Sequence, residues 1–527
     1  MRRREARARS VPAATAPGEA EQSVPGKRAG HLVRSVFACV LAGVLSGLAF
    51  APFAIVPAGW VGVAILFVAW ERSTPRQAVL VGFAFGTGLF VTGAYWLLPG
   101  LLRHGGYSLP ASIAAASFAI ALQASHVALA GLCRAIAPRS RVQWRLLVVM
   151  PCAFVLAEWL RSYTLTGFPW LALGYGQIDG PLAGFAPLGG VHSVSIVSAA
   201  VSGALAWLWL DRSRWKVAAV IAGGLLALGL ALGRVAWTTE TGRPIEVAAV
   251  QGNVASDIKW TPDHLQPTLD LYASATQAAW RGRKLDLVVW PETAVPARPD
   301  QVGPFLAGLQ QSAKAAGTTV VYGIIDVERE GAPRYFNAAV ATGTSQGTYR
   351  KRHLVPLTEF LPSFMPEDWR RRKLREAIAI FTSGTDVQPP IRVAGVTIGT
   401  TICYETAYGR LVRDPQGIAG ILMSLTNDDW FRGTTMPAQD HQVARMRALE
   451  SGREMLRVAN SGVTARITAD GQVAASLPTR ERATLVAQMR PRTGLTPYWR
   501  WGEWVWLAPV LAALVFSAVS GRQRVGK

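Results

Sequence analysis

The stretch Leu285-Asp-Leu-Val-Val-Trp-Pro-Glu292 is a short apolar run that ends in a carboxylate. Runs of this length, rich in Val, Ile and Leu, are typical of strands that are buried on both faces of a sheet. Similar runs recur between residues 244 and 490, and helical patterns alternate with them. This alternation predicts an α/β layer structure. The expected strands are 245–251, 285–290, 318–325, 336–342, 396–403, 421–425, 455–459 and 463–468, and the expected helices are 266–281, 303–316 and 438–454.

Long apolar stretches dominate the rest of the sequence. Half of the 527 residues are hydrophobic, only 17% are charged and 19 are Trp, which is too apolar for an ordinary soluble enzyme. A stretch of about 20 apolar residues can cross the hydrocarbon core of a bilayer. We therefore expect a multi-pass α-helical membrane protein with about eight spans. The expected spans are 33–49, 54–70, 77–98, 110–133, 143–160, 191–210, 216–234 and 504–520.

These spans divide the chain into five parts. Residues 1–32 are basic and lack apolar periodicity, and they are expected to form a disordered cytoplasmic tail. The other four parts are a seven-span bundle over 33–237, a catalytic α/β domain over 244–490, a C-terminal span over 504–520 and a cytoplasmic tail over 521–527.

Glu158 lies inside the fifth expected span. It should face the bundle interior, because a carboxylate that faces lipid is costly.

Much of the net charge of +21 comes from basic residues in loops that are expected to be cytoplasmic. Basic residues concentrate in alternate loops, for example at Arg72 and Arg76 and again at Arg212 and Arg214, and such loops are typically cytoplasmic. With a cytoplasmic N-terminus, seven crossings place the α/β domain on the extracytoplasmic side, and the last span returns the C-terminus to the cytoplasm. No basic face is interleaved with aromatic residues, so nucleic acid is not expected as a partner.

The four cysteines differ in their surroundings. Cys39, Cys133 and Cys152 lie in apolar runs and are expected to be packing residues. Cys403 instead ends the strand-like run over 396–402. The sequence shows neither a disulfide framework nor the paired His and Cys spacing of a metal site. Cys403 is therefore the one cysteine with a candidate chemical role.

Glu292 and Cys403 each come at or just after the end of an expected strand, and Lys351 follows the short run Gly347-Thr-Tyr-Arg350. A thiol becomes a good nucleophile only with a neighbouring base or cation, and Glu292 could be that base. Lys351 and the amide of Tyr404 could stabilise the negative charge that grows on a carbonyl oxygen under attack. From spacing alone, however, the three residues could equally be a packing cysteine, a turn glutamate and a solvated lysine.

Two further interpretations of the residues remain open at this point. His353 and His441 could form a Cys/His dyad with Cys403, although neither has an evident orienting carboxylate. The α/β domain could also be an inactive binding module of a transporter. The scarcity of ionisable residues within the spans argues against an ion-coupled transporter.

Several short strings make the α/β region resemble the nitrilase superfamily. With the spans around it, the chain over 33–520 resembles the apolipoprotein N-acyltransferase family, which completes bacterial lipoprotein maturation. Two strings depart from the family pattern: Leu357-Thr-Glu-Phe360 replaces a Phe-Gly-Glu-Tyr-like string, and Asp429 replaces an Ala, which leaves the shape of the substrate pockets open. The matching strings are Val250-Gln-Gly-Asn253, Trp290-Pro-Glu-Thr-Ala294, Tyr349-Arg-Lys-Arg-His-Leu-Val-Pro356 with Glu359, Ile402-Cys-Tyr-Glu405 and Asn427-Asp-Asp-Trp-Phe431.

The resemblance implies an αββα sandwich carried by a helical bundle, and it assigns a role to each candidate residue. Glu292 would be the general base, Lys351 the stabiliser of the oxyanion and Cys403 the nucleophile. The implied supporting residues are Glu359 and Glu405, and the implied substrate-binding residues are Tyr404 and Trp260.

The resemblance also implies the reaction. A phospholipid, usually phosphatidylethanolamine, would donate an acyl chain to Cys403 as a thioester. The acceptor would be the α-amine of the N-terminal S-diacylglyceryl cysteine of an apolipoprotein. The protein would work without cofactor or metal, as a monomer in the bacterial inner membrane with its catalytic domain in the periplasm. A membrane-tethered amidase or nitrilase that uses the same three residues, with water as acceptor, is the alternative.

Overall fold

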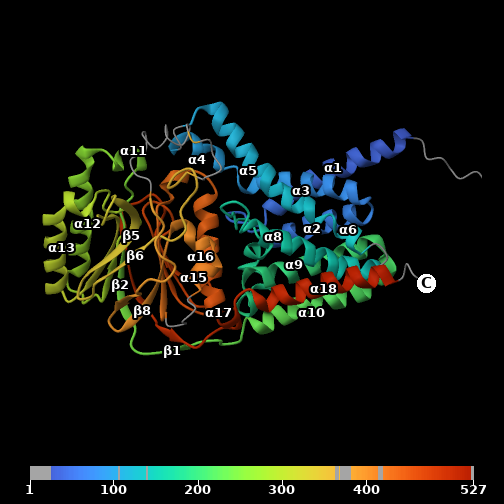
Figure 1. Ribbon diagram of the computed structural model, residues 1–527. Helices are drawn as coiled ribbons and strands as arrows, with labels where there is room; N and C mark the ends of the chain where they lie inside the picture. The colour runs from blue at the N-terminus through green and yellow to red at the C-terminus, as the bar shows by residue number, and fades with distance from the viewer. Residues whose placement is uncertain are drawn as a thin grey trace, which may run out of the picture.

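A helical bundle and an α/β sandwich lie side by side in the computed structural model (Figure 1). The structure describes residues 25–104, 107–137, 141–361, 367, 381–413 and 419–523. The helices of the bundle come from the first half of the chain and from its last helix. They are α1 (Pro25–Gly47), α2 (Val56–Glu71), α3 (Pro75–Gly93), α4 (Leu97–His104), α5 (Leu109–Ala130), α6 (Cys133–Ile136), α7 (Val142–Trp144), α8 (Met150–Arg161), α9 (Ala186–Leu210), α10 (Trp215–Leu232) and α18 (Trp504–Gln523).

Several of these helices are long and apolar enough to cross a membrane. Among the described residues there are five such helices, and a sixth if α3 and α4, which meet at a bend of 52°, form one span. Helix α2 and residues Trp504–Ser520 of α18 are shorter apolar helices. The expected span over 77–98 is thus broken, and at the break the Trp96 indole N–H donates to the Gly93 carbonyl at the end of α3.

The expected tails are shorter than the sequence analysis proposed. Helix α1 begins at Pro25 and α18 continues to Gln523, so residues 25–32 and 521–523 are helical. Residues 1–24 and 524–527 lie outside the described residues.

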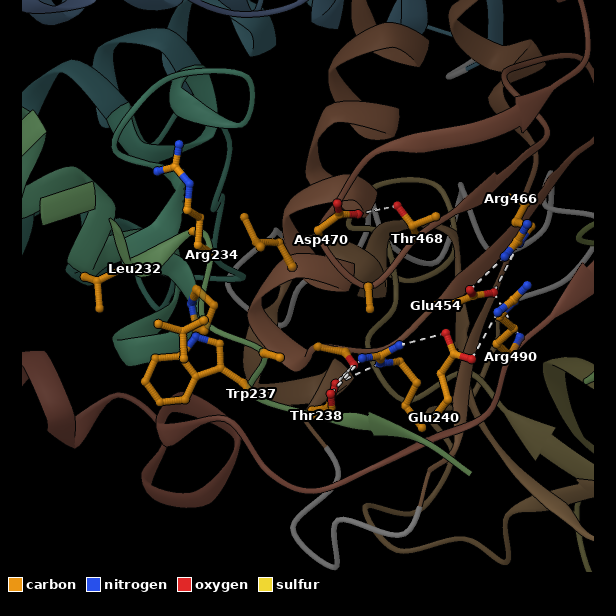
Figure 2. A pocket seen from close by; sticks show the side chains of 18 residues that line it. Leu232, Arg234, Trp237, Thr238, Glu240, Glu454, Arg466, Thr468, Asp470 and Arg490 are labelled. Atoms are coloured by element: carbon orange, nitrogen blue, oxygen red, sulfur yellow. Dashed lines mark hydrogen bonds and ion pairs between the residues drawn. The ribbon is translucent and has the colours of Figure 1, made fainter. Parts of the chain in front are cut away.

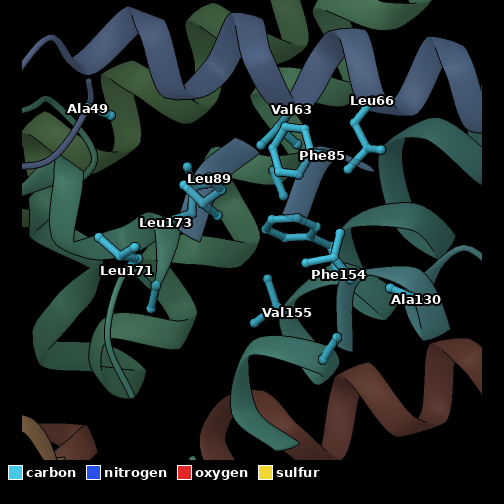
Figure 3. Packing of buried hydrophobic residues seen from close by; sticks show 14 of the residues in the cluster. Ala49, Val63, Leu66, Phe85, Leu89, Ala130, Phe154, Val155, Leu171 and Leu173 are labelled. Carbon is cyan, nitrogen blue, oxygen red and sulfur yellow. The ribbon is translucent and has the colours of Figure 1, made fainter. Parts of the chain in front are cut away.

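The bundle core is closely packed (Figure 3). Phe85 from α3 meets Phe154 from α8 edge to face, with ring centroids 6.4 Å apart. Glu158, as expected, is buried, and its Oε1 accepts a hydrogen bond of 2.8 Å from the backbone N–H of Leu173. Glycines let α1 and α3 approach closely, since a Cβ on Gly88 would lie 2.1 Å from the carbonyl oxygen of Val40.

The α/β domain is an αββα sandwich, as expected. Helices α12 (Pro262–Trp280) and α13 (Gly303–Ala315) cover one sheet, and α16 (Met436–Ser451) covers the other and also packs against α9 of the bundle. The apolar core between the sheets includes Ile245, Leu287 and Ile421. One sheet has the order β13-β2-β3-β4-β5-β6 and the other β12-β11-β10-β9-β8-β7.

The eight expected strands are the inner strands of the two sheets. The four edge strands were missed because they are short or mixed in polarity, and pairing with an inner neighbour holds them. The inner strands are β2 (Ile245–Gln251), β3 (Leu287–Val289), β4 (Thr319–Glu328), β5 (Arg334–Gly343), β8 (Val396–Ile402), β9 (Ile421–Thr426), β10 (Met455–Ala459) and β11 (Ala465–Ile467). The edge strands are β6 (Gly347–Arg350), β7 (Ile391–Val393), β12 (Val473–Ser476) and β13 (Ala483–Met489). A separate pair, β1 (Thr239–Glu240) and β14 (Arg492–Thr493), was also missed.

The close packing of α1 on α3 is testable by substitution. Gly88→Val should lower the free energy of unfolding by about 1–3 kcal/mol, because the new side chain collides with the backbone of α1. Thermal unfolding in detergent measures the effect. Gly223→Val in α10 is the matched control, since a Cβ there meets nothing within 4 Å. Equal melting temperatures for the two variants would contradict this packing.

Candidate active site

Three strand ends bring the candidate catalytic residues to one region of the sandwich. Glu292 follows β3, Lys351 directly follows β6, and Cys403 directly follows β8. Strands β3 and β6 belong to one sheet and β8 to the other, so the site is built from both sheets. The ends of buried strands in layered folds are a usual place for catalytic groups.

Lys351 joins two carboxylates. Its Nζ lies 3.3 Å from Oε1 of Glu292 and 2.9 Å from Oε1 of Glu359, and its side chain is 1% exposed. Burial disfavours the charged ammonium, but the carboxylates of Glu359 and Glu292 outweigh this effect and raise the pKa of Lys351 well above its ordinary value. The Lys351 side chain therefore carries a positive charge between the two carboxylates.

Asn337 in β5 belongs to the same group, and the sequence analysis missed it. Its Nδ2 donates to Oε1 of Glu292 at 2.7 Å and to Oε1 of Glu359 at 2.9 Å. The backbone carbonyl of Asn337 also accepts from the N–H of Lys351 at 2.8 Å. An amide inside an otherwise apolar buried strand was the signal, because buried polar groups need partners.

Cys403 lies on a strained turn. Its φ of 53° falls in the left-handed region, which costs a non-glycine residue about 1–3 kcal/mol. Burial, and then the negative charge of Glu292, raise the pKa of the Cys403 thiol well above its ordinary value, while Lys351 lowers it in part. The resting group is therefore the thiol, which has to lose its proton to a base when it attacks.

Glu405 holds this turn through its two oxygens. Oε2 accepts from the N–H of Ile402 at 2.8 Å and from the hydroxyl of Tyr349 at 3.0 Å. Oε1 accepts from the N–H groups of Arg352 at 2.6 Å and His353 at 3.1 Å. One buried carboxylate thus connects the turn at Cys403 to the segment that follows Lys351.

Tyr404 connects the turn at Cys403 to the helical bundle. Its ring stacks on Trp170 with centroids 6.1 Å apart, and its hydroxyl donates to the carbonyl of Gly167 at 2.9 Å. Trp170 in turn donates to Oε1 of Gln439 in α16 at 2.9 Å. The bundle loop around 166–170 therefore lies directly against the residue that follows Cys403.

Trp260 is half-buried at the end of α11 (Ser256–Lys259). It adjoins the site through its neighbour Lys259, whose Nζ lies 5.9 Å from the centre of the Trp260 ring and 3.2 Å from the carbonyl oxygen of Glu292. Lys259 is a second residue that the sequence analysis missed.

The two histidines do not fit a Cys/His dyad. Burial, with a smaller effect of Arg410, lowers the pKa of His353 to about 4, and its Nε2 lies 3.1 Å from the carbonyl oxygen of Thr166. Burial likewise lowers the pKa of His441 to about 3. Both rings are neutral near pH 7, and no carboxylate among the described residues hydrogen-bonds to either ring.

A pocket of about 490 Å³ lies elsewhere, between the end of α10 and the edge of the sandwich (Figure 2). None of the predicted site residues lines it. Three of its four arginines pair with its two glutamates, Arg466 with Glu454 and both Arg490 and Arg492 with Glu240. Nothing in its lining suggests catalysis.

The fold and this arrangement define a carbon–nitrogen hydrolase domain joined to a helical bundle. The family model described as carbon-nitrogen hydrolase matches residues 246–498, and the model described as apolipoprotein N-acyltransferase N-terminal domain matches residues 42–204. The chain belongs to the apolipoprotein N-acyltransferase family.

Individual relatives support this membership over about nine tenths of the chain. An apolipoprotein N-acyltransferase from Methylococcus capsulatus is 38% identical and covers 90% of this chain and 93% of its own. One from Coxiella burnetii is 35% identical and covers 90% and 97%. A solved carbon-nitrogen hydrolase from Helicobacter pylori is 15% identical, with a TM-score of 0.36 over 52% of this chain and 92% of its own. The fold assignment rests on the family matches and the sheet topology.

The charges around Cys403 predict the direction in which substitutions should shift the pKa of its thiol. In a protein without the other three cysteines, the pH dependence of Cys403 alkylation by iodoacetamide gives the apparent pKa of the thiol. Glu292→Gln should lower that pKa, because it removes a nearby negative charge, and Lys351→Met should raise it. Glu240→Gln, an exposed substitution away from the site, should leave it unchanged. Opposite shifts would mean that these groups do not act on the thiol as the geometry indicates.

Proposed function

We propose that Glu292, Lys351 and Cys403 form the catalytic triad of an acyl transfer that passes through a thioester on Cys403. The observation that supports this most directly is the buried Lys351 ammonium held between Glu292 and Glu359, 3.3 and 2.9 Å away, beside a thiol that needs a base. A carboxylate next to a fixed cation can accept the thiol proton while the cation stays in place for the developing oxyanion.

The family makes the protein an N-acyltransferase that acts on lipoproteins in a membrane, with a phospholipid as acyl donor. Membership gives no support to the amidase alternative over transfer. Within this reaction, we infer that phosphatidylethanolamine is the donor and that the α-amine of an S-diacylglyceryl cysteine is the acceptor.

In the first half-reaction, Glu292 takes the proton from the Cys403 thiol as Sγ attacks the ester carbonyl carbon of the phospholipid. Lys351 and the Tyr404 N–H stabilise the negative charge on the carbonyl oxygen. The bond from that carbon to the ester oxygen breaks, and the leaving oxygen receives the proton from Glu292. The products are the thioester and a lysophospholipid.

In the second half-reaction, the acceptor amine attacks the thioester carbon and gives a proton to Glu292. The carbon–sulfur bond breaks, Sγ regains a proton and the amide product leaves. Glu359 and Glu405 act as supporting residues, since Glu359 shares Lys351 and Asn337 with Glu292, and Glu405 holds the nucleophile turn. Tyr404 and Trp260 would shape the substrate site.

The contact between the bundle and the nucleophile turn supports catalysis at the bilayer surface. We propose about eight spans, with α2, α18 and the bent α3–α4 pair counted, and a catalytic domain over 244–490 in the periplasm of a bacterial inner membrane. The chain would act as a monomer, with both termini in the cytoplasm. The apolar helices and the alternating basic loops motivate this topology.

The thioester is the first test. Incubated with phosphatidylethanolamine alone, the protein should accumulate one acyl chain on Cys403, cleavable by neutral hydroxylamine, with an equal amount of lysophospholipid, as measured by mass spectrometry. Cys403→Ala and Cys403→Ser should abolish it, because a hydroxyl is too weak an acid for a carboxylate base. Lys351→Met should slow acylation by about 100-fold or more.

The same assay tests the acceptor step and the alternative reaction, hydrolysis with water as acceptor. Addition of a diacylglyceryl peptide should discharge the thioester and add one acyl chain to the peptide amine. Free fatty acid as the only product would favour hydrolysis. A Cys403→Ala protein that still acylated the peptide would defeat the proposed mechanism.

The topology is a separate prediction. Cysteines introduced by Lys284→Cys and Arg214→Cys, each in a background without the four native cysteines, should respond differently to a membrane-impermeant thiol reagent applied from outside the inner membrane. We expect Lys284→Cys to be labelled and Arg214→Cys to be protected until the membrane is permeabilised. The reverse pattern would invert the proposed orientation.

A further inference from the structure

A second buried lysine lies beside Glu292, on the backbone side of that residue. Lys259 at the end of α11 is 1% exposed. Its Nζ donates to the backbone carbonyl of Glu292 at 3.2 Å and to the hydroxyl of Thr293 at 2.7 Å. Burying an ammonium group is unfavourable unless its charge is compensated, so Lys259 is expected to have a structural or chemical role.

The segment that Lys259 contacts is strained. Thr293 has a φ of 48°, and the left-handed region is a genuine outlier for a β-branched residue. The turn is also packed closely against β4, since a Cβ on Gly323 would lie 2.3 Å from the backbone nitrogen of Thr293. Strained turns persist only where surrounding contacts hold them. The two hydrogen bonds from Lys259 are such contacts, one to the residue that bears the carboxylate and one to the strained residue that follows it.

The charged groups that face Lys259 are acidic. They are the carboxylates of Glu292 and Asp429, and Asp429 is itself held by Arg432 at 2.6 Å and by the N–H of Ser256 at 2.7 Å. Burial lowers the pKa of Lys259 to about 8, against the opposing effect of the two acids. At pH 7 the side chain is therefore mostly charged, and it adds a positive potential behind the base.

We propose that Lys259 is a positioning residue for Glu292, which holds the strained turn at residues 292–293 and places a positive charge behind the carboxylate. This inference rests on the proposed role of Glu292 as base. The proposed base then has two lysines beside it with different roles. Lys351 contacts the carboxylate of Glu292, and Lys259 contacts its backbone carbonyl.

The test is the pH profile of single-turnover acylation of Cys403 by phosphatidylethanolamine in the full-length protein. Lys259→Met fills a similar volume without charge. It should slow acylation by about 10-fold or more and leave the apparent affinity for phospholipid nearly unchanged. It should also move the acid limb of the profile to higher pH by about 0.5 unit or more, because the carboxylate of Glu292 loses a favourable positive charge.

A second variant separates the hydrogen bonds from the charge. Thr293→Val removes one acceptor but keeps the ammonium, so it should slow acylation less and leave the acid limb in place. Lys314→Met is the matched control, because Lys314 is an exposed lysine on α13. Thermal unfolding of each variant reports on folding separately.

The outcomes distinguish this inference from the proposed function. If the acid limb of Lys259→Met equals that of the wild type, Lys259 has only a structural role and the inference is overturned. This holds whatever the acylation rate and the melting temperature of the variant. Full acylation by Glu292→Gln would instead remove Glu292 as the base, whatever Lys259 does. A moved acid limb in Lys259→Met, with Lys314→Met unchanged, would support the inference.

Discussion

The ammonium of Lys351 is the interaction on which the rest of the site depends. Glu292 and Glu359 lie within 3.3 Å of it, and Asn337 donates to both carboxylates. Two negative charges in a buried region repel each other, and the cation that they share offsets this repulsion. The same cation partly offsets the effect of burial and of Glu292 on the Cys403 thiol.

Cys403, the proposed nucleophile, is fixed from three directions. Strand β8 delivers Cys403, Glu405 ties its turn to the segment after β6, and Trp170 of the bundle stacks on Tyr404. The first two are arrangements within the sandwich. The third connects the turn at Cys403 to the membrane part of the chain, because a loop between two bundle helices contacts Tyr404. An enzyme whose donor and acceptor are both lipid-anchored needs this proximity.

The sequence analysis identified the eight inner strands and missed the four edge strands. Inner strands are buried on both faces, so their sequences are continuously apolar and stand out. Edge strands such as β6 and β12 carry polar residues, and their strand conformation depends on a neighbour. The break between α3 and α4 was missed for a similar reason, because Trp96 there bonds both to Gly93 and to Gln439 in the other domain.

The sequence by itself determined the division into apolar helices and an α/β domain, because hydrophobic length and periodicity are local properties of the chain. It also identified Glu292, Lys351 and Cys403 as candidates, through strand ends and family strings. The family strings also implied Glu359 and Glu405 as supporting residues, but only the tertiary structure showed that Asn337 and Lys259 lie beside Glu292 as well. Asn337 and Lys259 are 45 and 33 residues away from Glu292 in the chain, and their roles follow from contacts that no local pattern encodes. Burial then decides the charge of each group, and burial exists only in the folded chain.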